Sequence, residues 1–353
     1  MTHWQSTLLS SSAPIAEAIR IIDESSKQIC LVVDDQGRLQ GTVTDGDIRR
    51  AILRSHPLDL PVERIMNRTP ITARPDEDRA ALLARMKARR VHQLPIVAAD
   101  GRVVGLAVVD EMMQVDQRGL DNWVVLMAGG LGMRLRPLTE DTPKPLLKVG
   151  NRPLLEIALE ELVRQGFRRF YVSVNYLGEK IKEALGDGAR WDADIRYLDE
   201  TKRMGTAGAL SLIPEPPEAP VMVMNADLLT KLNLKSLLDY HHDHRAAATI
   251  AVRDYEFQVP YGVVRVDNQR IVGIDEKPRQ HFFVNAGIYV LNPEVIARIP
   301  RDSFVDMPDV FDGLIRDGLP TAAFPLREYW LDIGRMNDFD QANRDVELEF
   351  PDR

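Results

Sequence analysis

Apolar and polar residues alternate in blocks along the second half of the chain. Short runs rich in Val, Met and aromatic residues predict buried strands, and segments with apolar residues every three or four positions predict helices between them. The predicted strands are 123–128, 170–175 and 220–225, and the predicted helices are 152–166, 179–186 and 234–244. This alternation predicts a mostly parallel sheet covered by helices, an α/β fold of the Rossmann-like type. We assign it to residues 122–353.

The first half of the chain contains an internal repeat. Residues 31–52 and 94–115 each predict a strand, a turn, a second strand and a helix, and an amphipathic helix precedes each copy, at 14–25 and 76–90. Glycines recur at matching positions, namely Gly37 and Gly41 in the first copy and Gly101 and Gly105 in the second. Each repeat is too small to be very stable alone, so two copies are expected to share a core. The repeats cover about 1–60 and 61–118, and the polar segment 116–122 predicts a linker.

Composition and charge narrow the function. The chain has 353 residues, 44% of them hydrophobic and 28% charged, which suits two globular domains. A net charge of −8 argues against a nucleic-acid or membrane footprint, so any anion site is local. Cys30 is the only cysteine, and the N-terminus lacks the pattern of a signal peptide. We therefore expect a cytoplasmic protein.

The repeated half resembles a pair of CBS domains, regulatory modules that bind adenosyl nucleotides between the copies. Members of that family hold a ribose with a threonine and an aspartate three residues later, and Thr44 and Asp47 match that pattern. Val108 and Glu111 replace them in the second copy, so the resemblance implies one nucleotide site rather than two. The same aspartate, with Asp45, also predicts a helix cap. Both interpretations stay open, since capping and ribose binding can coexist.

A glycine-rich loop follows the first strand of the second half. In "VLMAGGLGMRLRPLTEDTPKPLL", the glycines permit main-chain N–H groups to approach a phosphate. The spacing matches neither the dinucleotide fingerprint nor the Walker loop, which disfavours a Rossmann dehydrogenase and a P-loop ATPase. Arg134 follows two residues after Gly132, and Lys144 lies between Pro143 and Pro145, which restrict the backbone around it. The loop is therefore a candidate site for a polyanion.

The segment "LMAGGLGMRLRPLTEDTPKPLLKVGNRPLL" looks like the signature of the sugar-1-phosphate nucleotidyltransferases. The resemblance to that family extends over residues 123 to about 340. The resemblance implies that Arg134 and Lys144 hold the phosphates of a nucleoside triphosphate. The implied nucleotide-binding set is Leu126, Ala128, Gly129, Gly130, Gly132, Glu200, Gly205 and Thr206. Met133 departs from the family pattern, because a small hydroxyl residue is usual there; its loss could remove one phosphate hydrogen bond of about 1 kcal/mol.

Two aspartates far apart in the sequence follow strand-like segments. Asp227 lies in "VMVMNADLLT" and Asp332 in "YWLDIGRMNDF". Family members use an aspartate from each segment to hold a metal, and carboxylate and phosphate oxygens are the ligands that Mg²⁺ prefers. The resemblance therefore implies a magnesium cofactor held by this pair. In the implied reaction a sugar-1-phosphate oxygen attacks the α-phosphorus of the triphosphate and pyrophosphate leaves, with no general base required.

The resemblance also assigns the sugar and the base. Lys277 would contact the sugar phosphate as a third catalytic residue, and the implied sugar-binding set is Tyr261, Gly262, Glu276 and Asn285. Glu200 could accept the paired N–H donors of guanine, and "GTAGA" is closer to enzymes that make GDP-sugars from mannose-, heptose- or glucosamine-1-phosphate. A CBS pair ahead of this domain most resembles the glucosamine-1-phosphate guanylyltransferases of legionaminic-acid pathways, and we expect a homo-oligomer.

Several alternatives stay open. They are a mannose- or heptose-1-phosphate guanylyltransferase, a glucose-1-phosphate thymidylyl- or uridylyltransferase and, as a rival from another class, a non-catalytic nucleotide sensor. The histidines His241, His242 and His244 look like a metal cluster, but they end a predicted helix, where neighbouring side chains point apart. We interpret them as a solvated helix end that complements the helix dipole.

Overall fold

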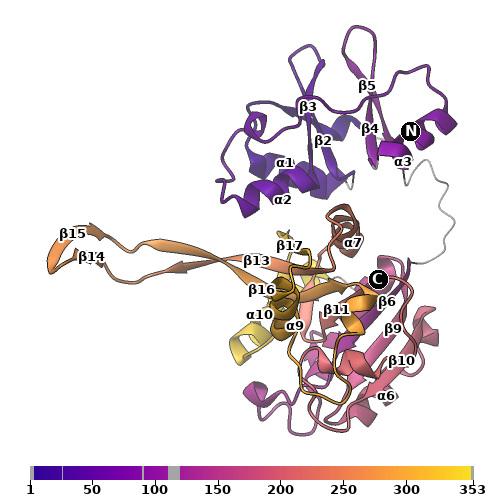
Figure 1. Ribbon diagram of the computed structural model, residues 1–353, viewed down its shortest axis with the longest axis vertical. Helices are drawn as coiled ribbons and strands as arrows, with labels where there is room; N and C mark the ends of the chain where they lie inside the picture. Colours follow the sequence, from indigo (N-terminus) through magenta and orange to yellow (C-terminus); the bar gives the residue numbers. More distant parts are fainter. Residues whose placement is uncertain (1–3, 26, 90, 110–119, 351–353) are drawn as a thin grey trace. The chain divides into compact units, whose positions relative to one another are not determined.

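The computed structural model describes residues 4–25, 27–89, 91–109 and 120–350. The chain divides into two compact units, Met1–Arg118 and Gly119–Arg353 (Figure 1). Glu111 and the helix expected after the second repeat lie outside the described residues. Along the part of the chain that is described, no helix is long and apolar enough to cross a bilayer.

The first unit consists of two similar halves, each with a helix before two antiparallel strands. Its elements are η1 (Trp4–Thr7), β1 (Leu8–Ser10), α1 (Ile15–Ser25), β2 (Ile29–Val33), β3 (Leu39–Thr44), α2 (Asp45–Leu53), η2 (Val62–Arg64), α3 (Arg79–Arg89), β4 (Gln93–Val97) and β5 (Val103–Val108). One apolar cluster combines residues from both halves, including Leu31 of β2 and Leu106 of β5. The two repeats therefore share a core, as the size of each repeat predicts.

The second unit is built on a seven-stranded sheet in the order β10-β9-β6-β11-β16-β13-β17. Its strands are β6 (Leu120–Met127), β9 (Phe167–Val174), β10 (Asp194–Asp199), β11 (Val221–Asn225), β13 (Ala248–Gln258), β16 (Arg279–Leu291) and β17 (Thr321–Leu326). Neighbouring strands are parallel except at β16, which runs antiparallel to both β11 and β13. The expected α/β fold with a mostly parallel sheet is confirmed.

Successive side chains of each strand point to opposite faces of the sheet, and apolar side chains on both faces form two apolar layers. Leu126 of β6 belongs to the layer that includes side chains of α5 (Leu154–Arg164), α6 (Gly178–Leu185) and α7 (Leu234–Asp243). Val125, the preceding residue, belongs to the layer that includes η6 (Gly208–Leu212), α8 (Pro293–Ile296) and α9 (Met307–Arg316). A further cluster forms around α10 (Met336–Glu349).

Short elements complete the second unit. They are η3 (Met133–Leu135), η4 (Lys144–Leu146), β7 (Lys148–Val149), β8 (Arg152–Pro153), η5 (Ala189–Trp191), β12 (Leu228–Thr230), β14 (Val263–Asp267), β15 (Arg270–Asp275) and β18 (Trp330–Asp332). Strands β13 and β16 continue beyond the sheet as a long two-stranded ribbon that ends in β14 and β15 (Figure 1). One boundary differs from expectation: residues 120–122, placed in the linker from their polarity, belong to β6 because Leu120 pairs with Phe167 of β9.

Candidate active site

The glycine loop begins where β6 ends. Ala128 N–H donates to the carbonyl of Ser173 in β9 (3.0 Å), which aligns the start of the loop with the neighbouring strand. Leu126 and Ala128 are buried in the core, so only their backbone can face a ligand. Gly132 has φ +62°, and a Cβ there would lie 2.9 Å from Thr139 Cγ2 and 3.2 Å from Lys144 Cβ. A glycine is therefore needed for both the turn and the close approach of Lys144.

Lys144 lies at the start of η4 and is almost completely buried, with 8% of its surface exposed. Its ammonium donates to Oδ2 of Asp227, which follows β11. The two residues are 83 positions apart in sequence, and the parallel pairing of β6 with β11 brings them together. A buried lysine is held here by a carboxylate at the carboxyl edge of the sheet, the edge where such sheets bind ligands.

Asp332 reaches the same place from the other end of the unit. It is paired with Leu228 in the short β12–β18 ladder, and Ile333 N–H donates to the carbonyl of Asp227 (3.1 Å). Burial raises the pKa of Asp332, and the charge of Asp227 raises it further, while the charges of Lys144 and Arg134 lower it. Arg134 also lies 3.5 Å from the position that a Cβ on Gly334 would occupy. Two cations and two carboxylates therefore surround one point beside the loop.

The two carboxylates have unused acceptors. Among the described residues, Oδ1 of Asp227 and Oδ1 of Asp332 are buried and accept no hydrogen bond. Buried carboxylate oxygens without partners are costly unless a ligand or cation satisfies them. The described chain offers no group of three or more His, Cys, Asp or Glu side chains able to hold a metal by themselves. A pair of free oxygens fits a hard cation that takes its remaining ligands from phosphates and water.

Glu200 closes another side of the loop. It follows β10, accepts hydrogen bonds from Ser173 Oγ and Met204 N–H (3.2 Å), and approaches Gly129 so closely that a Cβ there would lie 2.5 Å from Oε1. Burial raises the pKa of Glu200, and these two hydrogen bonds lower it in part. Gly130 has open space where a Cβ would be. The carboxylate and the glycine loop thus form one continuous surface.

The "GTAGA" segment is held by a residue that sequence reasoning missed. Oδ1 of Asp306 accepts from Thr206 N–H (2.9 Å) and Thr206 Oγ1 (3.2 Å), and Met307 N–H donates to Thr206 Oγ1 (2.8 Å). Gly205 has φ +78°, and a Cβ there would lie 2.4 Å from the carbonyl of Val305. Ser173 was missed as well, although a lone serine in the apolar run "FYVSV" was a visible signal.

Four of the expected site residues lie elsewhere. Tyr261, Gly262, Glu276 and Lys277 are on the ribbon formed by β13 and β16, outside the sheet (Figure 1). Tyr261 is 75% exposed, and a Cβ on Gly262 would lie 3.0 Å from Glu276 Oε2, so these residues neighbour one another and not the loop. Asn285 lies at the base of the ribbon, where its side chain bonds Gly287 N–H and Tyr289 Oη (2.8 Å each).

The histidine cluster requires a correction. His241 is not part of a solvated helix end: it is 1% exposed, and its ring nitrogens bond Thr249 Oγ1 (2.8 Å) and Asn292 Oδ1 (2.9 Å). Burial lowers the pKa of His241, the largest effect on it. His242 and His244 are exposed as expected. The misjudgement arose because α7 presents His241, unlike its neighbours, to the sheet.

Thr44 and Asp47 in the first unit form a complete helix cap. Thr44 Oγ1 accepts from Asp47 N–H (3.3 Å), and Oδ2 of Asp47 accepts from Thr44 N–H (2.9 Å) and Thr44 Oγ1 (2.7 Å). The other oxygen of Asp47 pairs with Arg50. The capping interpretation is confirmed for Asp47 at α2, whereas Asp45 pairs with Arg49, and the ribose role stays a prediction.

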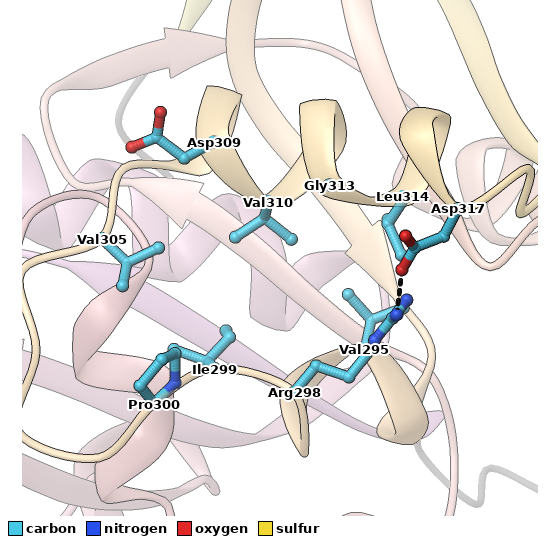
Figure 2. Close-up of a pocket in the computed structure, with 10 residues that line it drawn as sticks. All are labelled: Val295, Arg298, Ile299, Pro300, Val305, Asp309, Val310, Gly313, Leu314 and Asp317. Atoms are coloured by element: carbon cyan, nitrogen blue, oxygen red, sulfur yellow. Dashed lines mark hydrogen bonds and ion pairs between the residues drawn. The ribbon is translucent and has the colours of Figure 1, made fainter.

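A cavity of about 220 Å³ lies between α8 and α9 and is lined mainly by aliphatic side chains (Figure 2). An ion pair between Arg298 and Asp317 lies at one side of it. None of the residues expected in the active site lines this cavity along the described chain. Its connection to the site is indirect: Val305 lines the cavity, and its carbonyl accepts from Ala207 N–H (2.9 Å) in the "GTAGA" segment.

The comparisons with known proteins agree with this geometry. Residues 123–349 match the nucleotidyl transferase family, and residues 5–54 and 62–116 match the CBS domain. The match to the first family covers more than half of the chain, so the protein belongs to the nucleotidyl transferase family and carries two CBS domains. The resemblance to both families that the sequence predicts is therefore confirmed.

Individual relatives are sugar-1-phosphate nucleotidyltransferases. The chain is 36% identical over 222 residues to a mannose-1-phosphate guanylyltransferase catalytic subunit beta of Drosophila melanogaster, covering 61% of this chain and 60% of the relative. It is 35% identical over 242 residues to a UTP–glucose-1-phosphate uridylyltransferase of Synechocystis, covering 63% and 62%. The chain thus spans about 60% of the length of these curated relatives.

One solved structure allows a comparison of fold and sequence together. HddC from Yersinia pseudotuberculosis, crystallised in complex with GMP-PN, aligns with a TM-score of 0.51 and 27% identity. The alignment covers 64% of this chain and 99% of HddC. The alignment therefore takes in nearly the whole of HddC, which is similar in length to the second unit of this chain.

Proposed function

We propose that this protein transfers a nucleotidyl group from a nucleoside triphosphate to a sugar 1-phosphate, and that GTP is the preferred donor. The observation that carries the proposal is the meeting of Lys144, Asp227 and Asp332 beside the glycine loop, with two buried carboxylate oxygens left without partners. A cation or hydrogen-bond donors would satisfy both oxygens, and a polyphosphate with its metal supplies the cation.

The reaction that we propose needs positioning more than proton transfer. A phosphate oxygen of the sugar 1-phosphate attacks the α-phosphorus, the bond to the bridging β-phosphate oxygen breaks, and pyrophosphate leaves with the electron pair. Main-chain N–H groups of the loop at Gly129, Gly130 and Gly132 would orient the triphosphate, and Arg134 and Lys144 would offset its charge. The attacking oxygen is an anion near neutral pH, so no residue has to act as a general base.

Asp227 and Asp332 would hold a magnesium ion through their free oxygens. When bound, such an ion offsets the negative charge that two polyanions bring together. The chain's own contribution is to align both carboxylates: Lys144 lies against Asp227, and the β12–β18 ladder fixes Asp332.

Preference for guanine would come from Glu200. Ser173 Oγ and Met204 N–H occupy one acceptor position on each of its oxygens, which leaves further lone pairs for the N1–H and 2-amino donors of guanine. The relatives support this assignment, because several are named mannose-1-phosphate guanylyltransferases. For the sugar we propose glucosamine 1-phosphate, and the alternatives are mannose or heptose 1-phosphate; glucose 1-phosphate with another nucleotide remains the second candidate because of the uridylyltransferase relative.

A direct assay tests the proposal. The full chain with Mg²⁺ would be incubated with each common nucleoside triphosphate and with glucosamine, mannose, heptose and glucose 1-phosphates, and pyrophosphate release measured. We expect the largest kcat/KM with GTP and one hexose phosphate. Binding of GTP without release of pyrophosphate in any combination would instead favour a non-catalytic nucleotide sensor.

We also propose that the CBS pair binds an adenine nucleotide at its first repeat. Thr44 and Asp47 are present there, and CBS domains commonly take such ligands. The cap uses both oxygens of Asp47, yet each carboxylate oxygen can accept more than one hydrogen bond, so a ribose can be accommodated as well.

A further inference from the structure

The ribbon that carries Lys277 is long and continuously hydrogen-bonded. We call residues 253–284 the arm. Pairing between β13 and β16 runs without a break from Val252↔Asn285 to Gln258↔Arg279, and Val259 N–H then donates to the carbonyl of Pro278 (3.0 Å). Seven residue steps at roughly 3.3 Å each place Pro278 about 23 Å along the ribbon from Asn285. That distance is longer than any side chain, and the ribbon extends away from the sheet whose edge carries the Lys144–Asp227 pair (Figure 1).

The shaft of the arm has one apolar face. Tyr255 lies opposite Phe282 in the ladder, and Phe257 lies on the same face two residues along. All three are about half exposed. The opposite face is mainly polar: Glu256 pairs there with Arg279 and with His281, and Phe283, opposite Asp254, is its one large apolar side chain. A ribbon with one apolar and one charged face is the pattern of a half-buried sheet.

The tip of the arm repeats this pattern. Val264 lies opposite Ile274, and Val266 lies opposite Ile271. Ile271 is 66% exposed, Ile274 62% and Val266 61%. On the other face Arg265 pairs with Asp275. The apolar faces of the shaft and tip thus leave seven large apolar side chains uncovered. A two-stranded ribbon of this kind is at best marginally stable in water by itself.

We propose that the arm packs on a second copy of this chain and completes that copy's active site, with Lys277 and Glu276 supplied in trans. The inference rests on the proposed function, since it assigns these residues to the sugar phosphate and sugar. Its structural basis is the distance of Lys277 from its own site together with the uncovered apolar faces. A second copy explains both at once, because a two-fold dimer with exchanged arms covers each arm and serves both sites equally.

Other occupants fit less well. Folding back onto the arm's own unit would also bury the apolar face, but the ribbon extends away from the sheet with its ladder unbroken from Val252 to Gln258 (Figure 1). An unrelated partner would leave the site without the ammonium and carboxylate that sugar-phosphate binding needs. The balance of charge on the arm, with five Asp or Glu and five Lys or Arg residues, also suits a surface that contacts a copy of itself.

Subunit complementation tests the exchange. Lys277→Ala and Asp227→Asn chains would be coexpressed with different affinity tags and purified through both, so that only mixed dimers remain. Each single variant alone is expected to lose at least about 100-fold in kcat/KM. With arms exchanged, one site of the mixed dimer has Asp227 from the first chain and Lys277 from the second, and we expect about half of the wild-type activity. With arms acting in cis, both sites are defective and the mixed dimer is inactive.

The outcomes separate the two proposals. A wild-type chain that releases no pyrophosphate contradicts the proposed function. An active wild type with an inactive mixed dimer, with a fully active Lys277→Ala variant, or with a monomeric state at assay concentration, overturns the exchange and leaves the function intact.

A second measurement avoids catalysis. Ile271→Glu, on the apolar face of the tip, should shift the dimer to monomer in sedimentation, whereas Arg270→Glu, its neighbour on the polar face, should not. Equal sedimentation of Ile271→Glu and the wild type would overturn the proposal. Thermal melting of all four variants verifies that each is folded.

Discussion

At the scale of single residues, the site depends on carboxylates whose two oxygens have different environments. Oδ2 of Asp227 receives the ammonium of Lys144, while Oδ1 is buried without a partner. Removing either partner of such a buried ion pair would leave the other charge buried without compensation. The arrangement places negative charge where a metal would bind and positive charge where phosphates would lie.

Asp227→Asn is expected to abolish turnover and leave the fold intact. The amide keeps the shape of the side chain but removes the charge that a metal requires, and we expect kcat to fall by more than about 100-fold. Pyrophosphate release and thermal melting measure the two effects. Asp239→Asn, which removes a carboxylate 3.5 Å from Lys235 on α7, is the matched control and should retain activity. Near-wild-type turnover in Asp227→Asn would refute the metal assignment.

The position of Glu200 leads to a prediction about base preference and its dependence on pH. Glu200→Gln should reduce the preference for GTP over ATP by about tenfold or more, because an amide N–H would then face the N–H donors of guanine. Burial raises the pKa of Glu200 above its ordinary 4.5, and only the ionised form accepts both donors. The KM for GTP should therefore begin to rise at a higher pH than for an ordinary glutamate as the solution is acidified.

The measurement is the ratio of kcat/KM for GTP and ATP across pH, in Glu200→Gln and in the exposed control Glu215→Gln. Unchanged selectivity in Glu200→Gln would show that the base is recognised elsewhere.

At the scale of elements, α7 is joined to the sheet by a polar contact inside an apolar layer. His241 bonds Thr249 of β13 and Asn292, the residue after β16, so one imidazole connects a helix to two strands. Burial lowers the pKa of His241 below its ordinary 6.5, so the folded protein favours the neutral ring. The unfolded chain binds the proton more readily and is therefore favoured by acid.

The expected consequence is a loss of stability that begins as pH falls below about 6.5 and continues until the folded form is protonated too. Melting temperatures between pH 8 and pH 5 measure it. In His241→Gln, which retains hydrogen-bonding groups and does not titrate, the fall over this range should be smaller than in the wild type. Equal slopes in the two proteins would mean that other groups cause the acid sensitivity.

The position of a site residue relative to a helix or strand determined whether it could be predicted from the sequence. The glycine loop, Lys144 and Asp227 were accessible because each lies at or near the end of an apolar run, where parallel strands bring polar residues to one edge. The bond between Thr206 and Asp306 was not, because 100 residues separate them and their meeting depends on how α9 packs on the sheet. The prediction that His241 is exposed was wrong for a similar reason, because a helix pattern does not say which of two adjacent histidines faces inward.

At the scale of the whole molecule, the arm shows a different limit of sequence reasoning. The motifs around Tyr261, Glu276 and Lys277 identify a chemistry, but not the chain that uses it. A continuous ladder from Val252 to Gln258 carries those residues away from the sheet that their own chain provides. Spacing in a sequence cannot distinguish a hairpin that folds back from one that extends, because both satisfy the same alternation.

The CBS pair adds a prediction that concerns both units of the chain. An adenine nucleotide that binds the first repeat should raise the melting temperature of the full chain and change the KM for GTP. If the two sites are coupled, linkage requires that GTP change the affinity for the adenine nucleotide by the same factor. Calorimetric titration of AMP and ATP, with and without GTP, measures that factor directly.

Asp47→Asn separates ribose binding from helix capping. The asparagine side chain can still accept from Thr44 and cap α2, so the ligand-free variant should lose about 1 kcal/mol or less. Its carboxylate charge is gone, and the melting shift with AMP, measured against the variant's own ligand-free value, should shrink markedly. A shift as large as in the wild type would leave Asp47 as a cap only. No shift with any adenine nucleotide, in either protein, would leave the CBS pair as a structural module.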